Sequence, residues 1–580
     1  MKRFFCYILW MSIVLPVFGK GTVELRERIY VQTDKHLYLA GESVLMKLLT
    51  TDAEQIPLVF SKIAYAELVD DTIARIQVKV ELTNGTGTGQ MLLPVDLPTG
   101  YYRLIAYTQF MRNEGVEVFF EKNIAVMNTF QTDYLPAEVD TVSLSASSME
   151  EDVGTVSLQP NSETYPTRTR GELIISDLPE NMVTLSVSIT GKGYIPAAET
   201  DVSLFRQNRT KPNGNTITRP IEFIPEYEGH IIRGKLIDNQ KVDSETLTAS
   251  ESASNLPFGL RAGDFQYTSP CLSFPMVDGI RFFAGQKTES DEVRFYTSGV
   301  SGTKEIATVV YNAGEKYRVD ILSPFVNRYM PKPMPTLHLD SIYYDRLLAR
   351  SVALQASRYF SEDSPVNESV LKPYFKKKPD WSYLLDEYTR FTTMRDVFIE
   401  FIVGARFRRN AGKQEISVIT RKGSYFDYGS MPLVLLDGVP VSDHDAIYNY
   451  DPLAVEQINI YTGPLFMGGY IFDGIVELIT YRRLHADLQL DKSSQVIAYE
   501  GTQPPYRPDT PDYSNYKNRL SWMPDGRHTL LWNPDVQTNG KTSIRLPFDT
   551  SDLVGEFQAT VEGVTEDGKF VFATSFFKVE

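Results

Sequence analysis

Residues that commonly carry out catalysis or bind metals are thinly spread along this 580-residue sequence. None of its six histidines lies one helical turn from another or next to a cysteine, so the sequence contains no zinc-binding spacing. Ser442, Asp443, His444 and Asp445 are neighbours, but a catalytic triad is an arrangement in space and not a run along the chain. We expect this segment to form a polar turn. The alternative, a hydrolase acting on a surface polymer, would have His444 as its best candidate.

Glycine-rich and acidic segments give no stronger indication of chemistry. The sequence contains no G-x-S-x-G motif, phosphate-binding loop or dinucleotide fingerprint. The glycine-rich segment 84–90 precedes an expected strand, so it offers phosphate no helix N-terminus. The acidic segment 549–556 lacks the glycine-centred spacing of a calcium loop. We therefore predict a protein without cofactor or metal that binds and does not catalyse.

The first residues are typical of a secretory signal peptide, which we place at 1–19. Lys2 and Arg3 are followed by the apolar run 4–18, and Gly19 offers a small residue for cleavage. The run is short for a membrane span, and no later segment is long and apolar enough to replace it. We therefore expect export across a bacterial inner membrane, to the periplasm or the outer membrane of a Gram-negative cell.

The charge balance restricts the possible partners. The chain has 58 Lys and Arg against 74 Asp and Glu, a formal net charge of −16. So acidic a chain argues against nucleic acid and anionic lipid as partners. Cleavage of the signal peptide would leave Cys271 as the only cysteine, so no internal disulfide could form. We expect Cys271 to be a buried small hydrophobic residue.

Segment 20–142 is predicted to be a β-sandwich. The segment YVQTDKHLYLAGESV at 30–44 indicates two strands joined by a bend, in which Gly41 supplies a positive φ. The segment LPTGYYRLIAYT at 97–108 indicates a turn and a further strand. Together these segments resemble macroglobulin-type domains. The resemblance implies an alternative function, a protease-binding or defence protein, although the chain lacks the Gly-Cys-Gly-Glu-Gln thioester motif used for covalent trapping.

Three more β-rich units and a helical region are expected. Alternating apolar residues between 182 and 190 predict a second β-sandwich, which resembles the module that follows macroglobulin-type domains. The segment YEGHIIRGKLIDN at 227–239 resembles the opening of carboxypeptidase-regulatory-like β-sandwiches. Period-two alternation near the C-terminus predicts an immunoglobulin-like sandwich. The expected ranges are 155–226 for the second sandwich, 227–328 for the third, 336–392 for a helical linker and 495–580 for the C-terminal sandwich.

Segment 393–484 is expected to be a small α/β domain. A helix at 393–403 comes first. A strand buried on both faces follows at 434–436, and it ends in a tight turn at Asp437 and Gly438. The remaining elements are a helical turn begun by Asp451 and Pro452, a strand at 456–461 and a closing strand that ends at Thr480.

The order of these segments resembles the plug domain of TonB-dependent outer-membrane receptors. Too few residues follow Thr480 for an outer-membrane barrel, which needs many strands of ~10 residues each. The resemblance implies a Bacteroidetes-type envelope protein whose plug-like domain lacks its barrel. It also implies an outer-membrane protein or envelope polymer as partner, with membrane association through that partner. The matching plug-like motif residues are Asp437, Gly438, Glu456, Ile458, Gly463, Pro464, Gly474 and Thr480.

The sequence as a whole predicts a multi-domain, mainly β protein. Tandem immunoglobulin- and macroglobulin-like β-sandwiches would carry a small α/β plug-like domain near the C-terminus. We expect a non-catalytic function in binding, or in assisting transport, at the outer membrane. Trp532 is expected to be a core residue of the C-terminal sandwich, whereas Trp522, among polar residues, could be core or ligand platform.

Overall fold

The computed structural model describes most of the chain. The predicted signal peptide at 1–19 lies outside the described residues. Within the described ranges, no helix is both long and apolar enough to span a bilayer. These ranges are 25–130, 153–192, 200–210, 221–239, 269–274, 281–288, 291–311, 316–334, 337, 343–360, 378–410, 412–419, 431–467, 470–482, 493–504, 506, 508 and 510–580.

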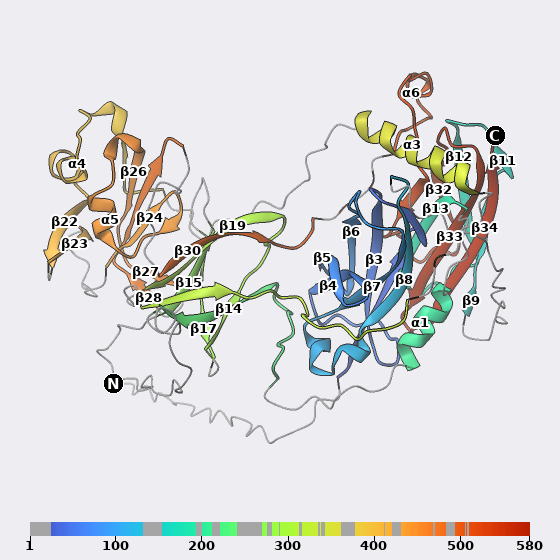
Figure 1. Cartoon of the computed structure of the whole chain (residues 1–580), viewed down its shortest axis with the longest axis horizontal. Coiled ribbons are helices and arrows are strands. Elements are labelled where there is room, and N and C mark those ends of the chain that lie inside the picture. The colour runs from blue at the N-terminus through green and yellow to red at the C-terminus, as the bar shows by residue number, and fades with distance from the viewer. Residues whose placement is uncertain are drawn as a thin grey trace, which may run out of the picture.

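The chain is built mainly from β-strands arranged in several packed units (Figure 1). Two β-rich units lie side by side at one end of the molecule, and a small α/β domain lies at the other end (Figure 1). A third β-rich unit lies between them. The prediction of a multi-domain, mainly β fold is confirmed.

The first unit is a sandwich of two sheets, as the strand pattern predicts. The bend after its first strand is held by Asp34, whose carboxylate accepts hydrogen bonds from the Tyr38 hydroxyl at 2.7 Å and the Leu45 amide at 3.2 Å. Gly41 has a φ of 94°, as its place in the bend requires. One sheet has the order β1 (Glu27–Thr33), β3 (Ser43–Asp52) and β6 (Thr86–Leu92). The other has the order β2 (Leu37–Leu39), β8 (Phe120–Met127), β7 (Gly100–Tyr107), β4 (Ile63–Asp70) and β5 (Ile73–Glu81), and the short 3-10 helices η1 (Phe110–Asn113) and η2 (Val116–Val118) connect β7 to β8.

The second sandwich is assembled from two distant segments of the chain. Leu185 faces Gly563 and Ser186 faces Glu562 in an antiparallel pairing that joins residues 182–191 to residues 557–565. The N-terminal segment supplies β9 (Val153–Thr155), β10 (Ser157–Pro160), β11 (Thr164–Tyr165), β12 (Arg170–Ser176) and β13 (Met182–Gly191). The C-terminal segment supplies β31 (Thr529–Asn533), β32 (Ile544–Asp549), β33 (Gly555–Thr565) and β34 (Phe570–Val579). The prediction of separate sandwiches at 155–226 and 495–580 is therefore wrong, because both segments fill one core.

The third unit also takes a strand from far along the chain. Its last strand, β30, pairs with β19 although the whole α/β domain lies between them in sequence. The prediction of a unit confined to 227–328 is thus incomplete. One sheet contains β17 (Gln286–Lys287), β18 (Glu292–Tyr296), β14 (Ile231–Asp238) and β20 (Tyr317–Ile321). The other contains β16 (Arg281–Ala284), β15 (Ser269–Phe274), β19 (Thr303–Tyr311) and β30 (Ser494–Glu500).

The α/β domain has one main sheet and a separate basic hairpin. Its sheet begins with a strand at 381–384, so the predicted boundary at 393 falls too late and the predicted helical linker 336–392 is only partly helical. The sheet order is β21 (Trp381–Leu384), β26 (Val455–Tyr461), β29 (Ile475–Thr480), β24 (Leu433–Leu436) and β25 (Val439–Pro440). The remaining elements are η4 (Leu385–Glu387), α4 (Met394–Glu400), the hairpin β22 (Ala405–Asn410) and β23 (Lys413–Val418), α5 (His444–Tyr448), η5 (Pro452–Ala454), and the hairpin β27 (Leu465–Met467) and β28 (Tyr470–Phe472).

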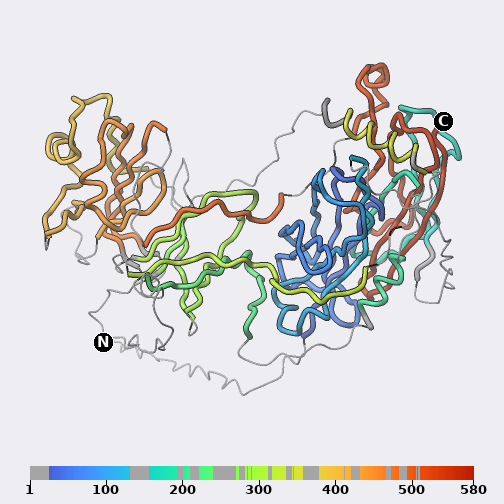
Figure 2. Tube along the Cα trace, in the orientation of Figure 1, coloured from blue at the N-terminus to red at the C-terminus, as the bar shows by residue number. Residues whose placement is uncertain are grey.

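The units are nested in one another along the chain. The α/β domain is inserted before the last strand of the third unit, and the third unit is inserted between the two halves of the second sandwich. Figure 2 shows the chain leaving the two-sandwich end and returning to it. Period-two alternation identifies strands but does not identify their partners, so this order could not be derived from the pattern.

Apolar contacts join neighbouring units. Helix α1 (Asp201–Thr210) places Leu204 and Phe205 in the core of the first unit, which also takes up Phe570 of the second sandwich. Helix α3 (Tyr344–Phe360) packs Leu347 against β2, and its Arg350 forms an ion pair with Glu42 at 2.6 Å.

The third unit packs on the α/β domain through a shared apolar cluster. Cys271 and Val309 of the third unit belong to one buried cluster with Leu433, Leu435 and Ile475 of the α/β domain. Cys271 is fully buried, as predicted, and burial raises the pKa of its thiol well above the usual value.

We predict that Leu185→Ala destabilises both halves of the second sandwich together. Leu185 is fully buried in the shared core, so its truncation should cost about 2–5 kcal/mol. Hydrogen exchange should show peptides from 182–191 and 555–565 losing protection by the same factor. Val183→Ala on the same strand, where the side chain is 41% exposed, is the control. Loss of protection in only one segment would contradict a shared core.

Candidate functional site

The plug-like motif residues mainly shape the α/β domain. Asp437 has a φ of 47° and Gly438 a φ of 82°, which together form the tight turn between β24 and β25. The Asp437 carboxylate accepts hydrogen bonds from the Thr480 amide at 2.7 Å and the Thr480 hydroxyl at 2.6 Å. The motif thus ties the turn to the end of the neighbouring parallel strand β29.

The other motif residues lie in strands and turns of the same sheet. Ile458 is fully buried in the domain core, and Glu456 is half-buried beside it on β26. Gly463 and Gly474 both have a φ of 100°, and a side chain at Gly474 would collide with the Tyr461 carbonyl. Pro464 follows Gly463 in the turn before β27. These residues are brought into one domain, where they form its strands and turns.

His444 also has a structural role in this domain. Asp443 caps the N-terminus of α5, so the predicted polar turn is a helix cap. The Nδ1 atom of His444 accepts a hydrogen bond from the Ile416 amide at 3.0 Å, which ties α5 to β23. Burial lowers the pKa of His444 to about 4, so the imidazole is neutral at physiological pH. Within the described ranges, no three His, Cys, Asp or Glu side chains are placed to hold a metal ion.

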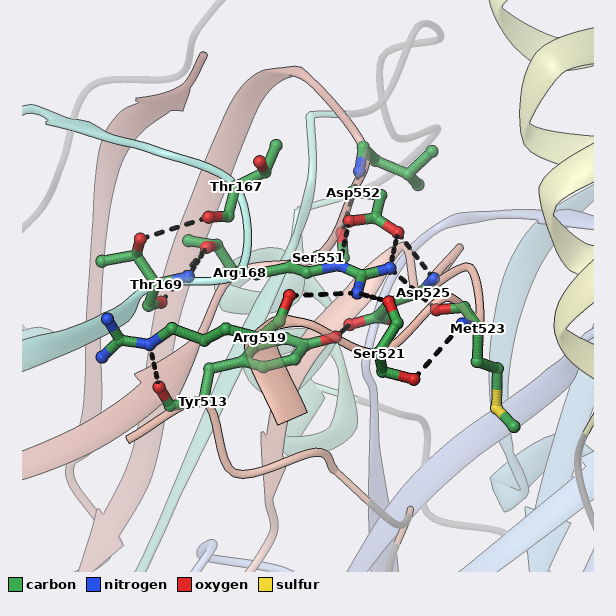
Figure 3. A network of polar contacts seen from close by, with 12 residues as sticks. Thr167, Arg168, Thr169, Tyr513, Arg519, Ser521, Met523, Asp525, Ser551 and Asp552 are labelled. Atoms are coloured by element: carbon green, nitrogen blue, oxygen red, sulfur yellow. Dashed lines mark hydrogen bonds and ion pairs between the residues drawn. The ribbon is translucent and has the colours of Figure 1, made fainter. Parts of the chain in front are cut away.

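A second constellation is centred on Arg168 (Figure 3). Arg168 has a φ of 50° and donates to both Asp552 oxygens, from Nε at 2.6 Å and from Nη2 at 2.7 Å. The same guanidinium donates to the carbonyls of Ser521 and, at 2.7 Å, Met523. The hydrogen bonds that Arg168 donates to Asp552 lower the pKa of this carboxyl, so Arg168 and Asp552 form a charged pair. Arg168 thereby fixes a loop of the C-terminal segment to the start of β12.

Further polar contacts complete this network. The Tyr513 hydroxyl donates to Asp525 at 3.0 Å, and the Asp525 amide donates to Asp552 at 2.8 Å. The Arg519 Nε donates to the Tyr513 carbonyl at 2.5 Å. The short helix α6 (Tyr516–Arg519) therefore sits on a loop held from both sides.

The loop presents large apolar side chains to solvent. We call residues 513–523 the apolar loop. Its side chains are exposed by 70% at Tyr516, 67% at Leu520, 79% at Trp522 and 42% at Met523. In Figure 1, α6 projects beyond the sandwiches. A rigidly held apolar projection is typical of a binding surface.

Sequence reasoning missed this network because its parts are far apart in the chain. Arg168 and Asp552 meet only through the two-segment sandwich. The single local signal was a tryptophan among polar residues, and the structure places Trp522 on the surface. Trp532 is 5% exposed, as expected of a core residue.

Comparisons with known proteins give only distant structural likenesses. No protein-family model and no curated protein matches the chain. Salmonella alpha-2-macroglobulin reacted with methylamine aligns with 97% of this chain and 40% of its own at 9% identity and a TM-score of 0.24. Trypsin-activated alpha-2-macroglobulin from Escherichia coli aligns with 97% of this chain and 42% of its own, at 9% identity and a TM-score of 0.24. The Escherichia coli adhesin FdeC aligns with 52% of this chain and 65% of its own, at 12% identity and a TM-score of 0.13.

The chain spans less than half the length of these macroglobulins. Such TM-scores do not assign the chain to either group.

We predict that Asp437→Ala destabilises the α/β domain by about 2–4 kcal/mol. The substitution removes two hydrogen bonds and places alanine at a positive φ. Asp437→Asn keeps an acceptor and tolerates this φ, so its effect should be smaller. Denaturant-dependent proteolysis of 378–482 measures both variants. Equal losses for Ala and Asn would contradict this account, because Asn keeps an acceptor and tolerates the positive φ.

Arg168→Lys should loosen the apolar loop. Lysine cannot reproduce the fork that reaches Asp552 and two carbonyls, and each charge-assisted hydrogen bond contributes about 1.5–3 kcal/mol. Trypsin should then cut at Lys517 and Arg519 about tenfold faster or more, because cleavage follows the open population. Arg170→Lys, which alters a single surface contact with Asp512, serves as the control. Unchanged cleavage in Arg168→Lys would contradict the role of the fork.

Proposed function

We propose that this chain is an exported, non-catalytic binding protein of the bacterial outer membrane, which docks on a membrane-protein partner through the apolar loop. The observation that carries the proposal is the exposure of Tyr516, Leu520 and Trp522 on a loop fixed by the Arg168 network. Apolar side chains held in water raise the free energy of the unbound protein. Their burial on a partner recovers it.

Rigidity strengthens the case for a protein partner. A loop that is already ordered loses little conformational entropy on binding. Trp and Tyr are the residues that most often dominate binding energy at protein interfaces. Leu520 and Met523 add aliphatic surface, which fits an apolar protein pocket better than the face of a sugar ring.

The place of action is inferred from the sequence. The signal-peptide pattern at 1–19 supports export, and the plug-like motif supports a location at the outer membrane. The fixed attachment of the α/β domain to the third unit fits a domain that is presented to a partner, in binding or in assisting transport. The use of His444 as a hydrogen-bond acceptor in the fold supports a non-catalytic function.

The macroglobulin-like alternative rests on a specific contact. Asp34 and Tyr38 of the YVQTDKHLYLAGESV segment fix the first unit's bend, and Glu42 of the same segment accepts hydrogen bonds from Arg350 of α3. A protease-binding protein without a thioester should form a stable complex or a single defined clip when incubated with proteases. General degradation, or no reaction with several proteases, would exclude this alternative.

The apolar loop can be tested by capture from outer-membrane fractions. Detergent-solubilised fractions should yield an outer-membrane protein that cross-links to a photoreactive residue at position 517, which is exposed in the same loop. Capture should fall at least about tenfold in Leu520→Ser/Trp522→Ser, because two anchor residues contribute about 1.5–3 kcal/mol each.

The matched control is Val59→Ser/Ile73→Ser on the first unit, where the two side chains are 70% and 58% exposed. Equal capture by both double variants would contradict docking through the loop. Recovery of no outer-membrane protein, with the chain free in the medium, would contradict the proposed function itself.

A further inference from the structure

The hairpin β22–β23 is basic although the chain is acidic. Arg406, Arg408 and Arg409 are exposed on β22, and Lys413 is exposed at the start of β23. The hairpin contains one acidic residue, Glu415. The net charge of −16 therefore conceals a local cationic surface.

The strand register decides which side chains share the outer face. Phe407 pairs with Ile416, and Phe407 packs on Phe398 with ring centroids 4.6 Å apart, so this pair faces the core. Successive residues of a strand point to opposite faces. Arg406 and Arg408 therefore lie on the outer face.

The outer face continues at the base of the hairpin. The Ile419 amide donates to the Gly404 carbonyl, which places Ile419 on the same face as the two arginines, and Ile419 is 44% exposed.

The arginines of this face are not neutralised within the part of the chain that the structure describes. No ion pair forms there with Arg406 or Arg408, nor with Arg409, which alternation places on the other face. Glu415, opposite Arg408, instead accepts two hydrogen bonds from Asn410 at 3.1 Å each. Like charges on one face of a strand repel, so an external anion would relieve this arrangement.

Exposed apolar residues lie on the hairpin and on the segment that leads into it. Ile419 lies on the cationic face itself, whereas Ile399 at the end of α4 is 62% exposed and Val403, just before β22, is 65% exposed. A nucleic acid or a free phosphate would leave these side chains in water. A lipid surface offers phosphate groups to the arginines and an apolar layer to the aliphatic residues.

The hairpin is also placed where a flat surface can reach it. In Figure 1, β22 and β23 lie at the end of the molecule opposite the two sandwiches. The acidic remainder of the chain extends away from them. Beyond a Debye length of about 10 Å at 0.1 M salt, its repulsion from an anionic surface is largely screened.

We propose that the outer face of β22–β23 binds the phosphate headgroups of a lipid bilayer, with Arg406 and Arg408 on the phosphates and Ile419 against the acyl layer. The planar guanidinium groups suit bidentate phosphate binding. The α/β domain then contacts the membrane directly, by a surface separate from the apolar loop. The acidic net charge argues against binding to anionic lipid, but this cationic face would bind it.

Vesicle flotation with the purified full chain tests this contact without any partner protein. The chain should float with vesicles of phosphatidylcholine and phosphatidylglycerol, and much less with phosphatidylcholine alone. Arg406→Gln/Arg408→Gln should lower the partition coefficient by at least about tenfold, since each basic residue near an anionic surface contributes about fivefold. Ile419→Ser should weaken binding further at high salt, where the apolar contribution remains.

The control is Arg346→Gln/Lys541→Gln, which removes the same charge from exposed positions of α3 and the second sandwich. Equal flotation with both vesicle types, or retained flotation of the hairpin variant, would overturn the proposal. So would binding of inorganic phosphate or duplex DNA by a chain that does not float. The flotation experiment contains no protein partner. A negative result would therefore count against lipid binding by the hairpin and not against docking through the apolar loop.

Discussion

The antiparallel pairing of β13 with β33 is the contact on which the rest of the structure depends. It brings Leu185 opposite Gly563, so the residues between them form one long insertion whose two ends are held together. The entropy cost of closing a loop grows only with the logarithm of its length, so a folded insertion of this size adds little to it. The pairing of β19 with β30 holds together the two ends of the inserted α/β domain in the same way.

Nesting fixes both ends of each inserted unit. The third unit leaves and returns beside the first unit, where Glu226 and His230 meet at 2.8 Å and Tyr65 donates to Glu226 at 2.8 Å. Lys79 lies 4.5 Å above the ring of Tyr499, and burial lowers the pKa of Lys79 to about 8. A buried polar contact of this kind favours one orientation of the third unit, because a buried polar group left without its partner is costly.

Charge is also buried between the first unit and the second sandwich. Lys122 pairs with Asp201 at 2.6 Å, and Tyr30 donates to Glu562 at 2.9 Å. Burial raises the pKa of Glu562 well above its usual value. Removing one partner of such a cluster leaves an uncompensated buried group, so the cluster favours a single docking of the two sandwiches. The apolar loop and the basic hairpin are thereby held at opposite ends of one framework (Figure 1).

The sequence by itself determined the local structure. The bend at Gly41, the turn at Asp437 and Gly438 and the burial of Cys271 follow from local residue chemistry, and the structure has them all. Only the tertiary structure decided which strands share a core. Strand alternation is the same whichever partner is chosen, so the joining of β13 to β33, the contact of Arg168 with Asp552 and the outer face of Arg406 depended on long-range packing.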